Sequence, residues 1–140
     1  MIPKSLRWLY VVNLALAAAH QVEATHWGEW GLLGIPVGVQ GFVVLTFLIF
    51  LFFLHGLVQL VRENRAGLWY SGVLAGGGLL STACHVYFLA RGDGGFTHPV
   101  ALLVLAGVGA VSLVQAVVTV RALPGAPDEP QAPEPDFVPE

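Results

Sequence analysis

Long apolar runs separated by short polar segments dominate the chain. Four largely apolar stretches are long enough to cross the hydrocarbon core of a bilayer, for which a helix needs about 20 residues. They cover residues 6–22, 37–61, 67–90 and 99–121. Because the connections between them are short, neighbouring helices are expected to run antiparallel. The pattern predicts an all-α integral membrane protein whose residues 1–122 form an antiparallel four-helix transmembrane bundle.

The composition agrees with this pattern. Only 11% of the residues are charged and 56% are hydrophobic, whereas soluble domains carry roughly a quarter charged residues. The single cysteine, Cys84, lies inside the third stretch. This excludes a disulfide framework and a cysteine-based metal motif.

The C-terminal segment has a different character. Residues 123–140 are rich in proline and acidic residues and cannot bury apolar surface, so we expect them to be disordered. The formal net charge of −3 comes mostly from this tail. It gives no reason to expect nucleic acid as a partner.

Basic residues near the ends of the stretches predict the orientation, because cytoplasmic loops of membrane proteins carry an excess of Lys and Arg. If the four stretches cross the membrane, one side of it holds Lys4, Arg7, Arg62, Arg65 and Arg121, and the other side holds only Arg91. We therefore expect a multi-pass protein of the bacterial inner membrane with both termini in the cytoplasm. Residues 23–36 and 91–98 would then lie outside.

The first stretch allows a second interpretation. A basic start, a short apolar core and an Ala-rich end are also typical of a signal peptide. A retained helix is favoured here, because the first stretch would carry His20 into the membrane.

Most of the candidate chemistry lies where the first apolar stretch ends, in the sequence His-Gln-Val-Glu-Ala-Thr-His-Trp-Gly-Glu at residues 20–29. Ionisable groups at a membrane boundary are costly and indicate a functional site. At about 1.5 Å per helical residue, His20 and His85 are expected at a similar depth near the outer face. The candidate metal ligands share this outer layer: His20, Glu23, His26, His85 and His98.

Imidazole and carboxylate groups are ordinary ligands of zinc and non-haem iron. A catalytic zinc with an open position would use His20, His85 and His98. Glu23 would then be a fourth ligand or a general base. Ser81 lies one turn before His85, where it would orient a ring or act on a substrate. The catalytic candidates are therefore Glu23 and Ser81.

Two other interpretations of the cluster stay open. It can be a hydrogen-bonded polar cluster or small-molecule pocket without a metal. It can also bind haem, with His20 and His85 as axial ligands across a bundle. We expect Glu29 to be a solvated loop carboxylate in either case.

Polar and small residues elsewhere are expected to have structural roles. Asn13, inside the first stretch, is expected to find a partner on a neighbouring helix. His55 lies near the inner side and is expected to hydrogen-bond Gln59, four residues later. The third stretch is rich in glycine, with Gly72, Gly76, Gly77 and Gly78. Because Gly72 and Gly76 also have the spacing of close helix contacts, these glycines predict the central packing face of the bundle.

The stretch from His20 through Trp30, continuing as Gly-Ile-Pro-Val-Gly-Val-Gln-Gly-Phe at residues 34–42, resembles a group of uncharacterised small bacterial four-helix membrane proteins. Their first helix closes on a His-x-x-Glu element, and a Trp-rich loop precedes the second helix. The resemblance covers roughly residues 8–120. Ala24 stands where the related His-x-x-Glu-Glu type has a second glutamate, which weakens the case for a two-carboxylate metal site. The resemblance supports the fold and the location of the site, and it implies no activity.

Three functions are consistent with these residues. The first is metal-assisted hydrolysis or isomerisation of a lipid-like substrate at the outer leaflet. The second is a binding or accessory subunit of a larger membrane complex, with a structural polar cluster. The third, a small transporter, would need a homodimer, because four spans leave little room for a pathway.

Overall fold

The computed structural model describes residues 2–31, 34, 36–92 and 98–123. Within them the chain is all-helical. Four long α-helices follow one another, and the short 3-10 helix η1 (Glu29–Gly31) comes after the first. The long helices are α1 (Lys4–Trp27), α2 (Gly38–Val61), α3 (Ala66–Ala90) and α4 (Pro99–Ala122). The acidic tail predicted to be disordered lies, from residue 124 onward, outside the described residues.

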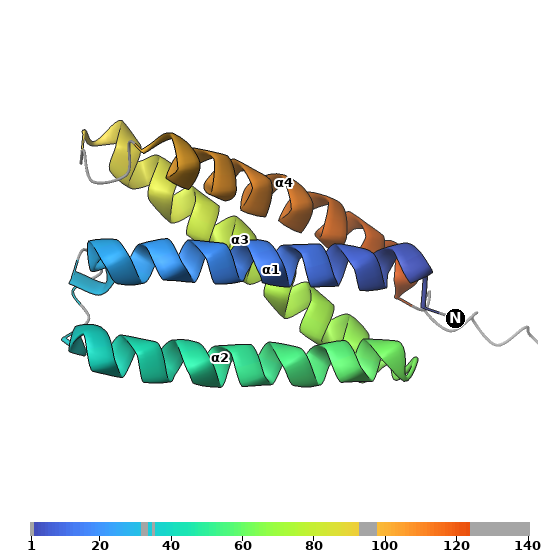
Figure 1. The fold of residues 1–140 in the computed structure, drawn as a ribbon. Coiled ribbons are helices and arrows are strands. Elements are labelled where there is room, and N and C mark those ends of the chain that lie inside the picture. Colours follow the sequence, from blue (N-terminus) through green and yellow to red (C-terminus); the bar gives the residue numbers. More distant parts are fainter. Residues whose placement is uncertain (1, 32–33, 35, 93–97, 124–140) are drawn as a thin grey trace, which may run out of the picture.

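The four helices form a bundle in which α3 runs obliquely to the others (Figure 1). The start of α3 lies near the end of α2, and its far end lies beside the start of α4 (Figure 1). Consequently, α2 and α3 diverge toward the end of the bundle that holds η1.

Three of the described helices, α2, α3 and α4, are long and apolar enough to cross a membrane. The remaining long helix, α1, has 24 residues but is too polar to be counted with them. Its sequence includes Asn13, His20, Gln21 and Glu23. The polar side chains that set α1 apart from the other helices are thus those of interest for function.

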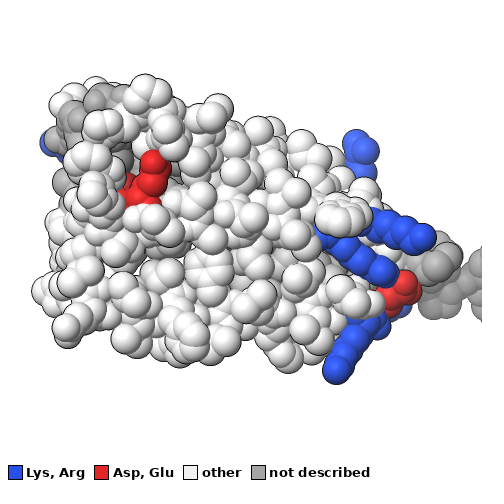
Figure 2. Space-filling model, viewed as in Figure 1, with Lys and Arg blue, Asp and Glu red and all other residues white. Residues whose placement is uncertain are grey.

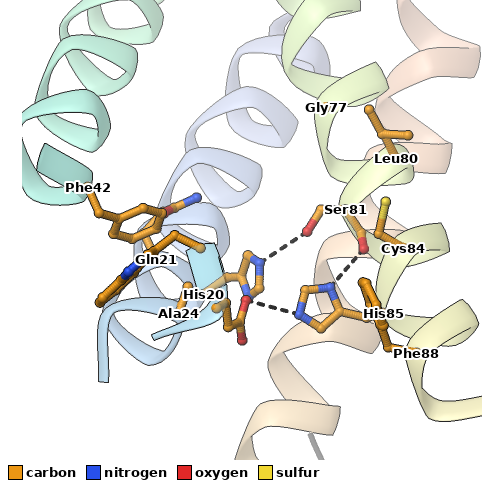
Figure 3. A pocket seen from close by; sticks show the side chains of 12 residues that line it. His20, Gln21, Ala24, Phe42, Gly77, Leu80, Ser81, Cys84, His85 and Phe88 are labelled. Atoms are coloured by element: carbon orange, nitrogen blue, oxygen red, sulfur yellow. Dashed lines mark hydrogen bonds and ion pairs between the residues drawn. The ribbon is translucent and has the colours of Figure 1, made fainter. Parts of the chain in front are cut away.

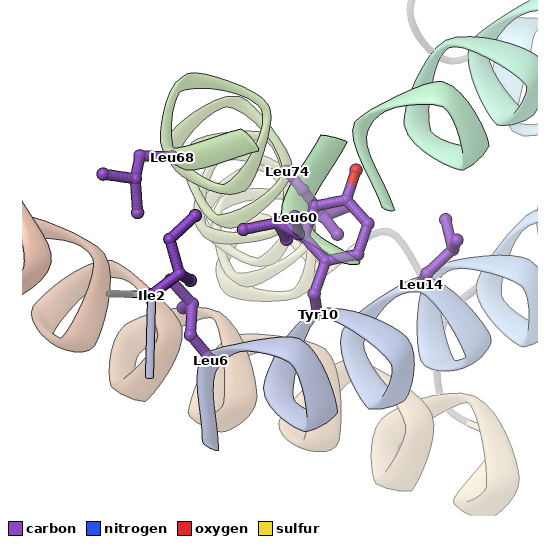
Figure 4. Packing of buried hydrophobic residues seen from close by; sticks show 7 residues of the cluster. All are labelled: Ile2, Leu6, Tyr10, Leu14, Leu60, Leu68 and Leu74. Carbon is purple, nitrogen blue, oxygen red and sulfur yellow. The ribbon is translucent and has the colours of Figure 1, made fainter. Parts of the chain in front are cut away.

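An apolar cluster holds the helices together near the start of α1. Tyr10 and Leu6 of α1 are fully buried and pack against Leu60 of α2 and Leu68 of α3 (Figure 4). The Tyr10 hydroxyl donates a hydrogen bond of 2.7 Å to the Phe53 carbonyl. Close van der Waals packing of these side chains holds the three helices together at this end.

A buried polar network joins α1, α3 and α4 in the middle of the bundle. The Asn13 amide donates to Ser112 Oγ at 3.0 Å and to Gln115 Oε1 at 2.8 Å. Gln115 in turn donates to the backbone carbonyl and to the hydroxyl of Ser71, at 3.1 and 2.9 Å. The prediction that Asn13 has a partner on a neighbouring helix is confirmed.

The prediction that the glycines of α3 form the central packing face holds at Gly78 and is wrong at Gly72 and Gly76. A Cβ added at either position would meet nothing within 4 Å, because both positions face outward. The close approach occurs at Gly78, where an added Cβ would clash with the Ser112 side chain of α4. Spacing alone could not decide which glycines of α3 face a neighbour.

Basic and acidic side chains are unevenly distributed between the two ends of the molecule. Lys and Arg cluster at the end where α1 begins, and a recessed acidic patch lies near the opposite end (Figure 2). At the basic end, Arg7 of α1 forms an ion pair of 2.6 Å with Glu63, which follows α2. There too, Gln59 hydrogen-bonds His55 at 2.9 Å, as predicted.

Candidate metal centre

Three side chains from separate parts of the chain meet at the end of the bundle opposite the basic one. His20 comes from α1, Glu29 from η1 and His85 from α3. One potential ligand atom from each lies within 4.8 Å of the other two. His20 is the most buried of the three, and Glu29 and His85 are partly buried, so none of them is fully exposed.

His85 is held by two contacts that fix its role. Its Nδ1 lies 2.9 Å from the Ser81 backbone carbonyl, and because a carbonyl only accepts, Nδ1 must donate (Figure 3). Its Nε2 lies 3.2 Å from Glu29 Oε2. A neutral ring would therefore turn its Nε2 lone pair toward a carboxylate, which is repulsive unless a cation lies between them. That cation is either a proton on the pair or a metal ion.

His20 reaches the same point from α1. Its Nε2 lies 3.1 Å from Ser81 Oγ (Figure 3). Its ring meets the His85 ring edge to face, with the centroids 4.8 Å apart. Ser81 thus contacts both histidines, through its hydroxyl and through its carbonyl. This is the arrangement expected of a residue that orients metal-binding imidazoles.

Glu29 is the residue that sequence reasoning missed. It is predicted to be a solvated loop carboxylate, but its side chain is only 12% exposed and pairs with His85. The cause is local: α1 ends at Gly28, whose φ of 65° lies in the left-handed region that glycine readily adopts. The Gly28 N–H bonds to the Ala24 carbonyl, and the chain turns so that η1 folds back over the histidines. In the sequence, the signal for this turn is the glycine that directly follows His26 and Trp27.

Glu23 lies beside the group without being one of its three members. It lines a small hollow of about 10 Å³ together with His20, Glu29 and His85. It comes from α1, one turn after His20. The structure thus places Glu23 next to the group.

The structure does not bring His26 and His98 into the group. His26 is exposed and lies edge to face with Trp27 at 4.9 Å, because α1 continues past His20 and turns His26 to another face. His98 precedes α4 and stacks on Trp27, with the ring centroids 4.7 Å apart. The structure therefore groups His20 and His85 with Glu29, and His98 lies outside this group.

A cavity of about 260 Å³ opens beside the group. His20, Ser81 and His85 form its polar wall (Figure 3). The rest of the lining is mostly apolar and includes Ala24, Trp30, Phe42, Leu80, Cys84 and Phe88. The site thus combines a few convergent polar groups with an apolar chamber, as small-molecule sites do.

The three ligands fit a divalent cation better than a haem. Two imidazoles and one carboxylate form a known catalytic zinc set that leaves one position open. Ligand atoms about 2.1 Å from a tetrahedral ion lie roughly 3.4 Å apart, so separations of up to 4.8 Å between the three atoms must close by up to about 1.4 Å. A haem iron between His20 and His85 would push the ring centroids well beyond the observed 4.8 Å.

Comparison with known proteins identifies a family for this chain but no activity. No curated protein and no solved structure matches the chain. One family profile matches residues 6–122, which include the four long helices except the first two residues of α1, and all three members of the group. The chain therefore belongs to a family of unknown function, DUF6713.

Proposed function

We propose that this protein binds a divalent metal ion, zinc before others, at His20, Glu29 and His85. The metal serves hydrolysis or isomerisation of a lipid-like substrate at the outer leaflet of the bacterial inner membrane. The observation that carries the proposal is the convergence of three ligand atoms within 4.8 Å at the wall of an apolar cavity. Ionisable residues retained at such a position in a membrane protein indicate function.

The location rests on four membrane spans with both termini in the cytoplasm. Three helices have the length and apolarity for this. We assign α1 as the fourth, because it packs within the same bundle and turns Asn13 and His20 toward its neighbours. Clustering of Lys and Arg at one end (Figure 2) supports the orientation, since that end would face the cytoplasm. The metal group then lies near the outer face.

Each residue of the site has a distinct part in this function. A bound metal would polarise a substrate oxygen or lower the pKa of a water molecule. Ser81 orients both imidazoles, and Glu29 supplies the negative ligand that compensates the charge of the ion. Glu23, in the adjoining hollow, is placed to accept a proton from the nucleophile.

Elemental analysis of detergent-purified protein tests the metal site. We expect near-stoichiometric zinc or another divalent metal in the wild type and at least a tenfold lower content in His20→Ala and Glu29→Gln. His55→Ala is the matched control, because His55 lies near the other end of the bundle and bonds Gln59. Equal metal content in the wild type and both site variants would refute the metal centre.

A second candidate is a non-enzymatic subunit of a membrane complex. It is favoured by the outward-facing Gly72 and Gly76 of α3, which line a groove beside Ala116 and Val120 of α4. Small residues on a lipid-facing surface allow another helix to approach closely. Co-purification of one defined membrane partner in a fixed ratio, without metal in the site, would favour this candidate.

A further inference from the structure

A second and larger cavity continues from the metal centre into the bundle. Its volume is about 540 Å³, within the range of small-molecule sites. It shares His20, Gln21, Gly77 and Ser81 with the cavity beside the metal group. The two cavities therefore adjoin, and the metal group stands at one end of a single crevice.

The deeper part of this crevice is almost wholly apolar. Its walls come from α2 and α3, with Phe50 and Phe53 on one side and Val73 and Leu74 on the other. On α1, Asn13 lines the end of the crevice farthest from His20. Its amide already bonds Ser112 and Gln115. From Asn13 to His20 the crevice extends about 10 Å along α1, a third of the hydrocarbon thickness.

The crevice lies where α2 and α3 diverge, as Figure 1 shows for the ribbon. On α2, Leu48 and Phe52 line the crevice and are also exposed on the surface of the helix, so the crevice borders the face that would contact lipid. A ligand could then enter sideways from the bilayer. This access suits a membrane lipid better than a water-soluble molecule.

We infer that the crevice holds one acyl chain of a phospholipid, with the phosphate or ester oxygens of the lipid at the His20–Glu29–His85 end. A divalent ion held by three protein ligands would have one coordination position left for an oxygen of the headgroup. The apolar walls replace the hydrocarbon surroundings of the chain. The headgroup assignment rests on the proposed metal site, whereas the acyl chain assignment rests on the apolar crevice.

Gly77 gives a direct way to close the crevice. It lines both cavities, and an added Cβ there would meet nothing within 4 Å. Gly77→Leu therefore fills the junction without a backbone clash. Gly76→Leu is the matched control, because Gly76 is equally open but lines the groove between α3 and α4.

The experiment uses the full chain in phospholipid nanodiscs that contain a phospholipid with a photoreactive diazirine in one acyl chain. After illumination, we expect cross-links concentrated on residues 48–53 and 73–74, with a yield at least fivefold lower in Gly77→Leu than in Gly76→Leu. The smaller Gly77→Val replaces Gly77→Leu if the latter does not reach the membrane. Equal yields in the Gly77 and Gly76 variants, or cross-links spread evenly over the lipid-facing helices, would overturn the inference.

Metal content measured on the same samples separates the two proposals. Wild-type metal in Gly77→Leu with lost cross-links supports a lipid crevice next to an intact metal site. Cross-links at the expected residues in a protein without metal would support the acyl chain and refute the metal function. Metal at the wild-type level without cross-links in the crevice would support the metal site and refute the acyl chain assignment.

Discussion

Ser81 shows how one residue can control a site without being a ligand. Its hydroxyl contacts His20 and its carbonyl accepts from His85, so it fixes two rings that come from different helices. Only the hydroxyl can be removed by substitution. The two contacts can therefore be separated experimentally.

Ser81→Ala is expected to weaken zinc binding 10- to 100-fold, the range found when groups that orient metal ligands are removed. Competition with a chromogenic chelator measures this affinity. Thr82→Ala is the control, since the Thr82 hydroxyl bonds the Gly78 carbonyl of its own helix. An unchanged affinity in Ser81→Ala would show that the hydroxyl does not position His20.

At the residue scale, the sequence predicts the histidine pair better than the carboxylate. Helical rise places His20 and His85 at one depth, and their rings do meet. His98 has a similar depth but stacks on Trp27, because depth does not specify direction within the layer. Glu29 escapes prediction, since its position depends on a turn and not on a periodic pattern.

At the scale of the secondary-structure element, the turn that positions Glu29 lies at the C-terminal end of α1. Gly28 adopts a φ of 65°, and the three residues of η1 follow at once. A residue with a Cβ in this conformation costs about 1–2 kcal/mol. The backbone at Gly28 therefore positions the Glu29 carboxylate beside His85.

Gly28→Ala is expected to lower the zinc affinity and the Tm of the protein, because relief of the strain moves Glu29 away from His85. Gly31→Ala in the same segment is the control. Gly31 has open space for a Cβ and is not among the residues with positive φ. Chelator competition and thermal unfolding in detergent are measured on both variants, and equal effects would contradict a special role for Gly28.

The helices themselves follow closely from the pattern of apolar residues. Hydrophobic runs specify where a helix lies, and Pro99 specifies where α4 begins. The pattern does not specify which face of a helix meets a neighbour when nearly every residue is apolar. This explains why the prediction for Gly72 and Gly76 is wrong while that for Asn13, a lone polar residue, is confirmed.

At the scale of the whole molecule, the separation of charge between the two ends supports one orientation. Fluorescent proteins that fold only in the cytoplasm, fused before Met1 or after Glu140 in two separate fusion proteins, are expected to fluoresce in both cases. Alkaline phosphatase inserted at Gly92 is expected to be active, since that loop would lie outside. Fluorescence from only one terminus would indicate three spans, with α1 not crossing the membrane.

The buried network also has a consequence for the distant metal centre. Asn13 and His20 are seven residues apart, close to two helical turns, and so point the same way from α1. The bonds from Asn13 to Ser112 and Gln115 lock the rotation of α1 about its own axis. The direction of the His20 side chain is therefore set about 10 Å away, by side chains that do not belong to the His20–Glu29–His85 group. The network thus fixes which face of α1 each of its side chains occupies along the whole helix.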